Sequence, residues 1–308
     1  MTVRHLLEID DLSAGELALV LDLAATHPVP ALLDGRGVAL VFEKPSARTR
    51  NATEMAVVQL GGHPLPIAGG EIGIGTRESP EDLARTLACY HAIIGARVFR
   101  HGTLQSMAAA LDAAGVVVPV VNLLSDTAHP CQALADLLTL REAFGRLEGL
   151  TVTFVGDSAN NVATSLALAC AMSGVRLRTA SPAGYGPEPS TFDRVAALGG
   201  VVEHGQDPYA AVVGAHAIYT DVWTSMGDEG QAADRRAAFA GFTVDDRLVA
   251  AARPDAIVLH CLPAKRGEEI TASVIEGERS AVFRQAANRM HAMRGLLWWL
   301  AEHMETAR

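Results

Sequence analysis

The sequence predicts an α/β protein made of two doubly wound parallel-sheet domains with an interdomain cleft, linked by crossing helices. Short apolar runs typical of buried strands alternate with helix-like segments along the chain. This order favours parallel βαβ units with helices on both faces of a sheet. The chain has 308 residues, which is enough for two domains of about 150 residues each.

Composition narrows the class of protein. With 49% hydrophobic and 19% charged residues, the chain is globular and not disordered. Its formal net charge of −10 argues against a nucleic-acid partner. The cysteines are too widely spaced for a zinc or redox motif, and they stand at Cys89, Cys131, Cys170 and Cys261. The first residues lack the apolar core of an export signal, and no apolar run is long enough for a bilayer. We therefore expect a cytoplasmic enzyme with no metal and no membrane partner.

The first half of the chain opens with a helix over 11–26, for which Ser13 is a candidate cap. Strands are then expected over 37–42, 63–67, 92–99 and 116–122, and helices over 51–60, 78–91 and 101–114. A glycine-rich loop is expected over 68–77.

The second half repeats this order. Strands are expected over 151–155, 175–181, 200–203, 215–220 and 256–260, with a helix over 161–172. The residues from Thr243 to Asp246 resemble a capping box that opens a further helix.

Two helices are expected to join the halves. One helix covers about 130–145 and has Pro130 at its first position. The other covers 280–303 and returns to pack against the first half. The predicted domains are accordingly 1–130 with 285–308, and 131–284.

The turn after the first strand carries a candidate phosphate site. Pro45 and Ser46 stand between the strand over 37–42 and a helix. Two hydroxyls and two guanidiniums fall within five residues there, those of Ser46, Arg48, Thr49 and Arg50. Unpaired N–H groups at a helix start and forked arginine donors together suit a dianionic phosphate. The alternative is an ordinary serine cap followed by solvated arginines.

Two further clusters follow strands of the first half. Arg97 lies at the end of an apolar strand, and a buried charge there needs a partner, which is either an anionic ligand or a structural carboxylate. His129 and Gln132 open the helix that begins near Pro130. His129 could donate to a carbonyl oxygen and Gln132 could bind an amide, or the two could be a helix cap and a surface side chain.

Three more clusters follow strands of the second half. Residues 156–161, Gly-Asp-Ser-Ala-Asn-Asn, lack the glycine fingerprint of a dinucleotide site and could be a simple loop. Asp221 opens a segment with hydroxyl and backbone donors that could hold an amino acid. Cys261, beside His260 and Pro263, is either a small core residue or a group facing the cleft.

Together these motifs resemble the aspartate/ornithine transcarbamylase family and, within it, the ornithine carbamoyltransferases. The resemblance covers nearly the whole chain. It rests on six motifs in the family's order: Ser46-Ala47-Arg48-Thr49-Arg50, Arg97, His129-Pro130-Cys131-Gln132, Asn161 with Asp221-Val222-Trp223-Thr224-Ser225-Met226-Gly227, His260-Cys261-Leu262-Pro263 and Arg289.

The resemblance implies a cofactor-free transfer of a carbamoyl group from carbamoyl phosphate to L-ornithine, giving L-citrulline and phosphate. It implies that the donor is bound by Ser46, Ala47, Arg48, Thr49, Arg97, His129, Gln132, Leu262 and Arg289. It implies that ornithine is bound by Asn161, Asp221, Ser225, Met226, Cys261 and Leu262. Arg97, His129, Cys261 and Arg289 would be the catalytic residues, and the enzyme would be a homotrimer or a multiple of trimers.

The sequence departs from the family pattern at two positions. Ala47 replaces the usual threonine, which removes a hydroxyl contact and leaves the backbone N–H. Gly73 stands about where relatives place a side chain that reaches a neighbouring subunit's phosphate.

The alternatives to an ornithine enzyme are a carbamoyltransferase for another amine and a catalytically silent protein that binds a phosphorylated metabolite.

Overall fold

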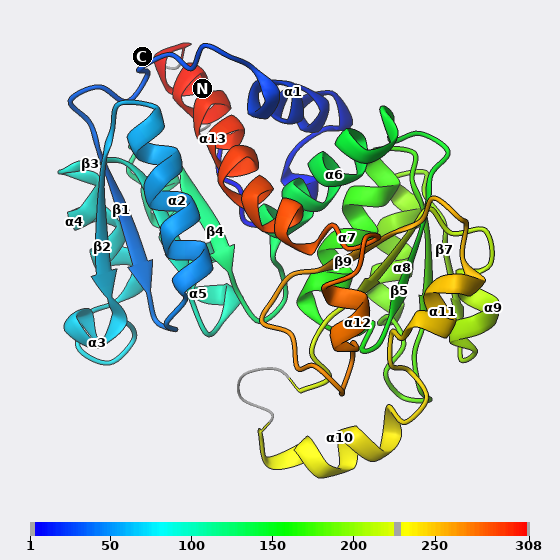
Figure 1. Ribbon diagram of the computed structural model, residues 1–308. Coiled ribbons are helices and arrows are strands. Elements are labelled where there is room, and N and C mark those ends of the chain that lie inside the picture. Colours follow the sequence, from blue (N-terminus) through cyan, green and yellow to red (C-terminus); the bar gives the residue numbers. More distant parts are fainter. Residues whose placement is uncertain (1–3, 225–228, 307–308) are drawn as a thin grey trace. The chain divides into compact units, whose positions relative to one another are not determined.

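The computed structural model describes residues 4–224 and 229–306. The chain divides into two compact units, one formed by Met1–Ala135 with Ala287–Arg308 and the other by Asp136–Ala286. Each unit has one sheet in which every strand pair is parallel (Figure 1). The predicted α/β fold class with two doubly wound parallel sheets is confirmed.

The sheet of the first unit has the strand order β2-β1-β3-β4. Its strands are β1 (Gly37–Phe42), β2 (His63–Ala68), β3 (His91–Arg97) and β4 (Val120–Leu124). The edge strand β2 contains Pro64 and Pro66, which is where a sheet tolerates residues without an N–H donor. The helices are α1 (Ala14–Ala25), α2 (Ala47–Gln59), α3 (Gly69–Ile72), α4 (Pro80–Ala88), α5 (His101–Ala113) and most of α13 (Val282–Thr306), after the 3-10 turn Ile9–Asp11.

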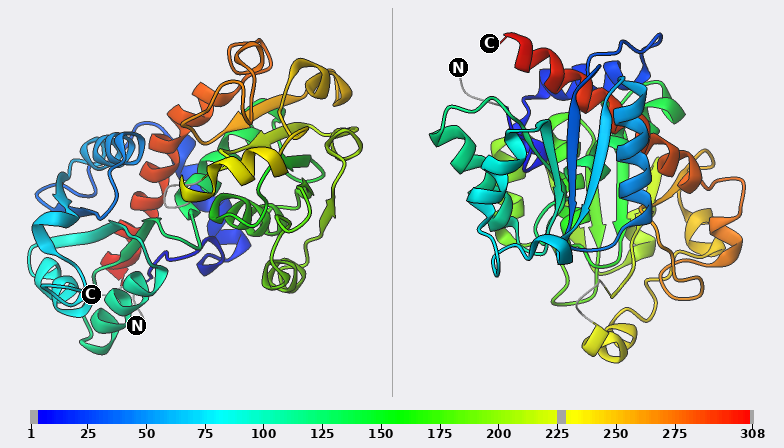
Figure 2. Two further views of the ribbon diagram at one scale, coloured as in Figure 1. Left: turned by 90° about the horizontal axis from the view of Figure 1, so that it is seen from below. Right: turned by 90° about the vertical axis from the view of Figure 1, so that its left-hand side faces the viewer.

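Helices cover both faces of this sheet. Helix α2 lies on one face, and α4 and α5 lie on the other (Figures 1 and 2). Alternate residues of β1, including Ala39 and Val41, pack with Leu83 of α4 and Leu104 of α5 in one buried core. Because both faces are covered, the strands can be almost wholly apolar.

The sheet of the second unit has the strand order β7-β6-β5-β8-β9. Its strands are β5 (Thr151–Val155), β6 (Arg176–Ala180), β7 (Val202–Gly205), β8 (Ala217–Thr220) and β9 (Ile257–His260). The helices are α7 (Asn161–Met172), α8 (Pro189–Ala197), α9 (Pro208–Val212), α10 (Ala232–Ala238), α11 (Asp246–Ala251) and α12 (Ala272–Ile275), with the 3-10 turn Glu229–Gln231. Helix α6 (Pro130–Phe144) begins in the first unit and ends in the second. In the described part of the chain, no helix is both long and apolar enough to cross a membrane.

Most predicted strands and helices are present within a few residues, but three local predictions were wrong. Helix α2 begins at Ala47, four residues earlier than predicted, because Ser46 caps it. A short helix, α3, interrupts the loop expected over 68–77. The strand expected from residue 116 begins only at Val120.

The predicted capping box at Thr243 was also wrong. Helix α11 is capped by Asp245, whose side chain accepts a hydrogen bond from the Leu248 backbone N–H at 2.7 Å. The Thr243 hydroxyl instead donates to the Glu268 carbonyl at 2.8 Å, and Val244 forms a bridge with Ile270. This pairing keeps Thr243 and Val244 extended, so the helix starts two residues later.

Helices α1 and α13 approach each other closely at Gly295. A Cβ atom on Gly295 would lie 2.4 Å from the Val20 carbonyl oxygen and 2.6 Å from the Ala24 nitrogen, both on α1. The neighbouring Arg294 is buried and donates to the Ala24 carbonyl oxygen at 2.5 Å. A side chain at Gly295 would therefore push apart two helices that a buried hydrogen bond holds together.

We predict that Gly295→Ala lowers the free energy of unfolding by about 1–3 kcal/mol, the usual cost of an overpacked contact. Thermal or denaturant unfolding followed by circular dichroism measures the change. Gly102→Ala is the matched control, because Gly102 lies on helix α5 and a Cβ there meets nothing within 4 Å. Equal stability of the two variants would contradict the prediction.

Candidate active site

The carboxyl ends of β1, β3 and β4 meet at one edge of the first sheet, where the chain changes direction. From β1 the chain continues outward to β2, and from β3 it continues the other way to β4. Open parallel sheets bind ligands beside such a switch point. The register pairs Phe42, the last residue of β1, with Arg97, the last residue of β3. The turn after β1 therefore lies at the same edge as Arg97.

Ser46 and Thr49 shape this turn. Ser46 caps α2, and its hydroxyl accepts a hydrogen bond from the Thr49 N–H at 3.3 Å. Nη1 of Arg97 donates to Oγ1 of Thr49 at 3.3 Å, and both residues are buried. A guanidinium thus lies beside the first turn of a helix, where backbone N–H groups lack helical partners. This combination suits a phosphate or another compact anion.

His129 is held in its neutral form. Burial, followed by the charges of Arg289 and Arg97, lowers the pKa of His129 well below its ordinary value. Arg289 is only 5% exposed, and neither of its Nη atoms has a hydrogen-bond acceptor within the described residues. Two buried guanidiniums near one imidazole favour an anionic ligand, because burying positive charge is costly and an anion offsets that cost.

Cys131 and Gln132 occupy the first turn of α6 and are both buried. The Cys131 thiol donates to the Asn122 carbonyl at 3.3 Å. Burial raises the pKa of Cys131 to about 11, which outweighs the opposing effect of Arg289. The thiol is therefore protonated and unreactive. Of these two residues, Gln132 is the one whose side chain can form hydrogen bonds with a ligand amide.

The second unit has its own switch point, between β5 and β8. From β5 the chain continues to β6 and β7 on one side, and β8 and β9 lie on the other. The loop from Gly156 to Asn160 follows β5, Asp221 follows β8 and Cys261 follows β9. Three predicted clusters therefore meet at one edge of this sheet.

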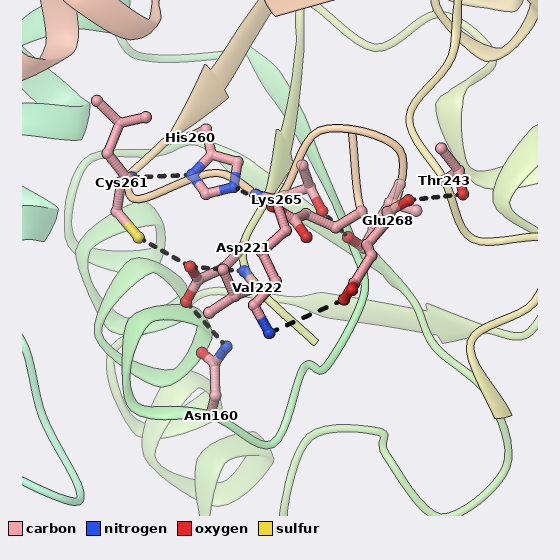
Figure 3. Close-up of polar contacts among 12 residues, drawn as sticks. Asn160, Asp221, Val222, Thr243, His260, Cys261, Lys265 and Glu268 are labelled. Carbon is pink, nitrogen blue, oxygen red and sulfur yellow. Dashed lines mark hydrogen bonds and ion pairs between the residues drawn. The ribbon is translucent and has the colours of Figure 1, made fainter. Parts of the chain in front are cut away.

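Asp221 is the centre of this edge (Figure 3). Its carboxylate accepts hydrogen bonds from the Cys261 thiol at 3.0 Å, the Val222 N–H at 2.8 Å and the Asn160 amide at 3.4 Å. Burial raises the pKa of Asp221, and the electrostatic interaction with His260 and the hydrogen bond from the Cys261 thiol oppose this shift. A ligand ammonium group beside Asp221 would offset the cost of burying its charge.

His260 holds the turn that contains Cys261 and Leu262. Nδ1 of His260 accepts a hydrogen bond from the Leu262 N–H at 2.8 Å, so Nε2 carries the proton and donates to Glu269 at 3.1 Å. Leu262 has φ 60° and is the one non-glycine residue with positive φ in the ranges described. The buried His260–Glu269 pair thus supports a backbone conformation that leucine rarely adopts.

The ligand atoms of Asp221, His260 and Cys261 lie within 4.8 Å of one another, a spacing that could suit a metal ion. Both ring nitrogens of His260 are already engaged, however, by Leu262 and Glu269. At most two ligands remain, which is fewer than protein zinc sites use. The arrangement fits a hydrogen-bonded site better than a metal centre.

The predicted site residues thus fall into two groups, one in each unit. Ser46, Thr49, Arg97 and Arg289 lie with His129 in the first unit, and Asp221, Cys261 and Leu262 lie together in the second. Ala47 and Arg48 lie on the exposed first turn of α2, and Asn161 is the first residue of α7, after the cap Asn160. Ser225 and Met226 lie outside the described residues.

Two residues that contact His260 were not predicted from the sequence. Glu269 stands in a charged run that resembles a solvated loop, yet it is fully buried against His260. Gln285 accepts a hydrogen bond from the His260 N–H at 2.8 Å and donates to the buried Asp136 at 2.7 Å. The Gln285 contacts join segments that are distant along the chain, and the burial of Glu269 has no signal in the charged run around it.

Comparison with known proteins assigns both parts of the chain to one family. Residues 4–142 match the carbamoyl-P binding domain of the aspartate/ornithine carbamoyltransferases, and residues 148–300 match the Asp/Orn binding domain. The chain belongs to the aspartate/ornithine carbamoyltransferase family. The predicted resemblance is therefore confirmed.

Relatives within this carbamoyltransferase family match over nearly their full length. An ornithine carbamoyltransferase of Acidothermus cellulolyticus is 52% identical over 311 residues, covering 97% of this chain and 97% of that protein. The crystal structure of ornithine carbamoyltransferase from Thermus thermophilus has a TM-score of 0.87 at 43% identity, covering 97% of this chain and 99% of that one. The Pyrococcus furiosus enzyme has a TM-score of 0.89 at 41% identity, covering 96% of each chain.

We predict that His129→Gln reduces the loss of stability in acid. The folded chain resists protonation of His129, whereas the unfolded chain takes up this proton below about pH 6.5. Stability therefore falls as the pH drops from about 6.5 toward the lowered pKa, and the glutamine variant lacks this contribution. Thermal midpoints at about pH 7.5 and pH 5.5 measure the difference.

The control for this titration is His27→Gln, which removes an exposed imidazole. It should show the same acid loss of thermal midpoint as the unaltered protein. If His129→Gln also shows that full loss, His129 is not the group that stays neutral.

Proposed function

We propose that this protein transfers the carbamoyl group of carbamoyl phosphate to the side-chain amine of L-ornithine, giving L-citrulline and phosphate. The observation that carries the proposal is the set of two buried guanidiniums, Arg97 and Arg289, around the neutral imidazole of His129. Such a set favours a ligand that is both anionic and rich in hydrogen-bond acceptors. Family membership supplies the reaction class.

In this proposal, residues of the first unit hold the donor. Ser46, Arg48 and Thr49, with the backbone N–H of Ala47, bind the phosphate at the start of α2. Arg97 compensates its remaining charge and is already oriented by its bond to Thr49. Gln132 binds the carbamoyl nitrogen.

The carbamoyl oxygen gains negative charge when the amine attacks the carbon. In this proposal Arg97, His129 and Arg289 donate to this oxygen, and the neutral state of His129 leaves it a donor without adding a third buried charge. Donors that are oriented before the reaction stabilise the transition state without reorganisation. Phosphate then leaves as the C–O bond breaks, and the nitrogen loses its proton.

Residues of the second unit hold the acceptor. Asp221 and Ser225 bind the α-ammonium group, and Asn161 and the Met226 N–H bind the α-carboxylate. Cys261 and the Leu262 carbonyl orient the side-chain amine. This amine must be neutral to attack, so the rate should rise toward alkaline pH.

The acceptor is the first point to test. Purified protein with carbamoyl phosphate should release citrulline and phosphate in equal amounts with L-ornithine, and should give no carbamoyl aspartate with L-aspartate. Turnover with aspartate alone would contradict the choice of acceptor. Binding of carbamoyl phosphate in calorimetry without turnover of any amine would instead favour a silent binding protein.

We predict that Arg289→Gln lowers kcat/KM by about 10²- to 10³-fold, as expected for the loss of one donor to a developing oxyanion. Arg284→Gln is the matched control, because Arg284 lies on the same helix with an exposed side chain. Steady-state assays with both substrates measure the change. Equal activity of the two variants would remove Arg289 from the proposed site.

We also propose that the enzyme works in the cytoplasm as a homotrimer or a multiple of trimers. Exposed apolar side chains on α2 and β2 support an interface there; they are Met55, Val58 and Leu65. The free state of all four cysteines agrees with a reducing compartment.

We predict that Val58→Lys dissociates the assembly, because it places a charge in an apolar interface. Light scattering after size exclusion should give a multiple of three times 32.4 kDa for the unaltered protein and a smaller mass for the variant. Leu19→Lys, at a similarly exposed apolar site on α1, is the control and should keep the full mass. A mass of one chain for the unaltered protein would contradict the trimer.

A further inference from the structure

Asp157 is a buried carboxylate that the proposed reaction does not use. It lies in the loop after β5 and is 6% exposed. Its Oδ2 atom forms an ion pair with Nη2 of Arg235, a residue of α10 that is 8% exposed. Burial raises the pKa of Asp157, and the charge of Arg235 opposes that shift. A buried pair of this kind is retained at a cost in desolvation.

Arg235 makes two further contacts that fix its guanidinium. Its Nε atom donates to the carbonyl oxygen of Trp223 at 2.6 Å. Its guanidinium carbon lies 5.0 Å from the centre of the Tyr185 ring, a cation–π distance. The guanidinium thus joins the loop after β5 to the segment after β8.

Both joined segments carry residues of the proposed acceptor site. Trp223 is two residues after Asp221, and its ring stacks on Phe239 at 5.6 Å. Oδ1 of Asp157 accepts a hydrogen bond from the Ala159 N–H at 3.1 Å, and the next residue, Asn160, donates to Asp221. The ion pair therefore closes a ring of contacts that passes through Asp221.

We propose that the Asp157–Arg235 ion pair is a positioning pair for the acceptor amino acid. It sets the distance between Asp221 and the loop that carries Asn160 and Asn161, and it does not touch the substrate itself. This inference rests on the proposed function. It implies that loss of the pair weakens the use of ornithine and leaves the use of carbamoyl phosphate unchanged.

The test compares Asp157→Asn, Arg235→Gln and the double variant with the unaltered protein. The KM for L-ornithine should rise about tenfold or more in each single variant, because a hydrogen bond to a charged group is worth roughly this factor. The KM for carbamoyl phosphate should stay within about twofold. The double variant leaves no unpaired buried charge, so its effect should be smaller than the product of the two single effects.

Arg236→Gln is the matched control. Arg236 is the next residue on α10 and pairs with Glu268 at 3.0 Å, but its side chain is 55% exposed. An exposed pair contributes little, so this variant should keep both KM values. Amide hydrogen exchange of peptides covering 156–161 and 221–224 should be faster in Asp157→Asn than in Arg236→Gln.

The outcomes separate this inference from the function on which it rests. If the unaltered protein forms no citrulline, the proposed function fails. If it does, but the variants raise both KM values equally or lower only kcat, the pair is structural and the inference is overturned. A selective rise in the KM for ornithine supports it.

Discussion

The first unit depends on two buried guanidiniums that are held near one buried imidazole. Arg97 and Arg289 flank His129, and burial together with these charges keeps the imidazole neutral. Removing a guanidinium from water costs several kcal/mol even after relaxation. The sheet, the start of α2 and the helix α13 must be stable enough to hold both groups in place. A bound anion would offset part of this cost.

Parallel topology explains why the functional residues collect where they do. In each sheet, the chain continues in opposite directions from the two strands of a central pair. This pair is β1 and β3 in the first unit and β5 and β8 in the second. The segments that follow a diverging pair cannot pack on each other as closely as neighbouring loops elsewhere, so side chains can project there. The first unit uses this position for cationic groups, and the second uses it for the carboxylates of Asp157 and Asp221. The two sheet edges therefore differ in charge, although each lies at the switch point of a parallel sheet.

The sequence predicted site residues where their position depends on the neighbouring residues in the chain. Ser46 could be recognised as a residue between a strand and a helix, and the structure makes it the cap of α2. Arg97 could be recognised as a charge at the end of an apolar strand. Arg235 and Glu269 could not, because each lies among other charged residues and nothing in the local pattern marks its buried partner, Asp157 or His260. The error at Thr243 has the same origin, since pairing with residues near 270 overrode a local capping signal.

The close approach of α1 and α13 at Gly295 has a consequence beyond stability. Gly295 lies six residues after Arg289 on one continuous helix, a separation of about 9 Å along its axis. Because the backbone hydrogen bonds of a helix fix the rise between its residues, the contact with α1 and the position of Arg289 on the helix axis are coupled. The N-terminal helix α1, remote from Arg289 in sequence, is thereby linked to it through a single helix.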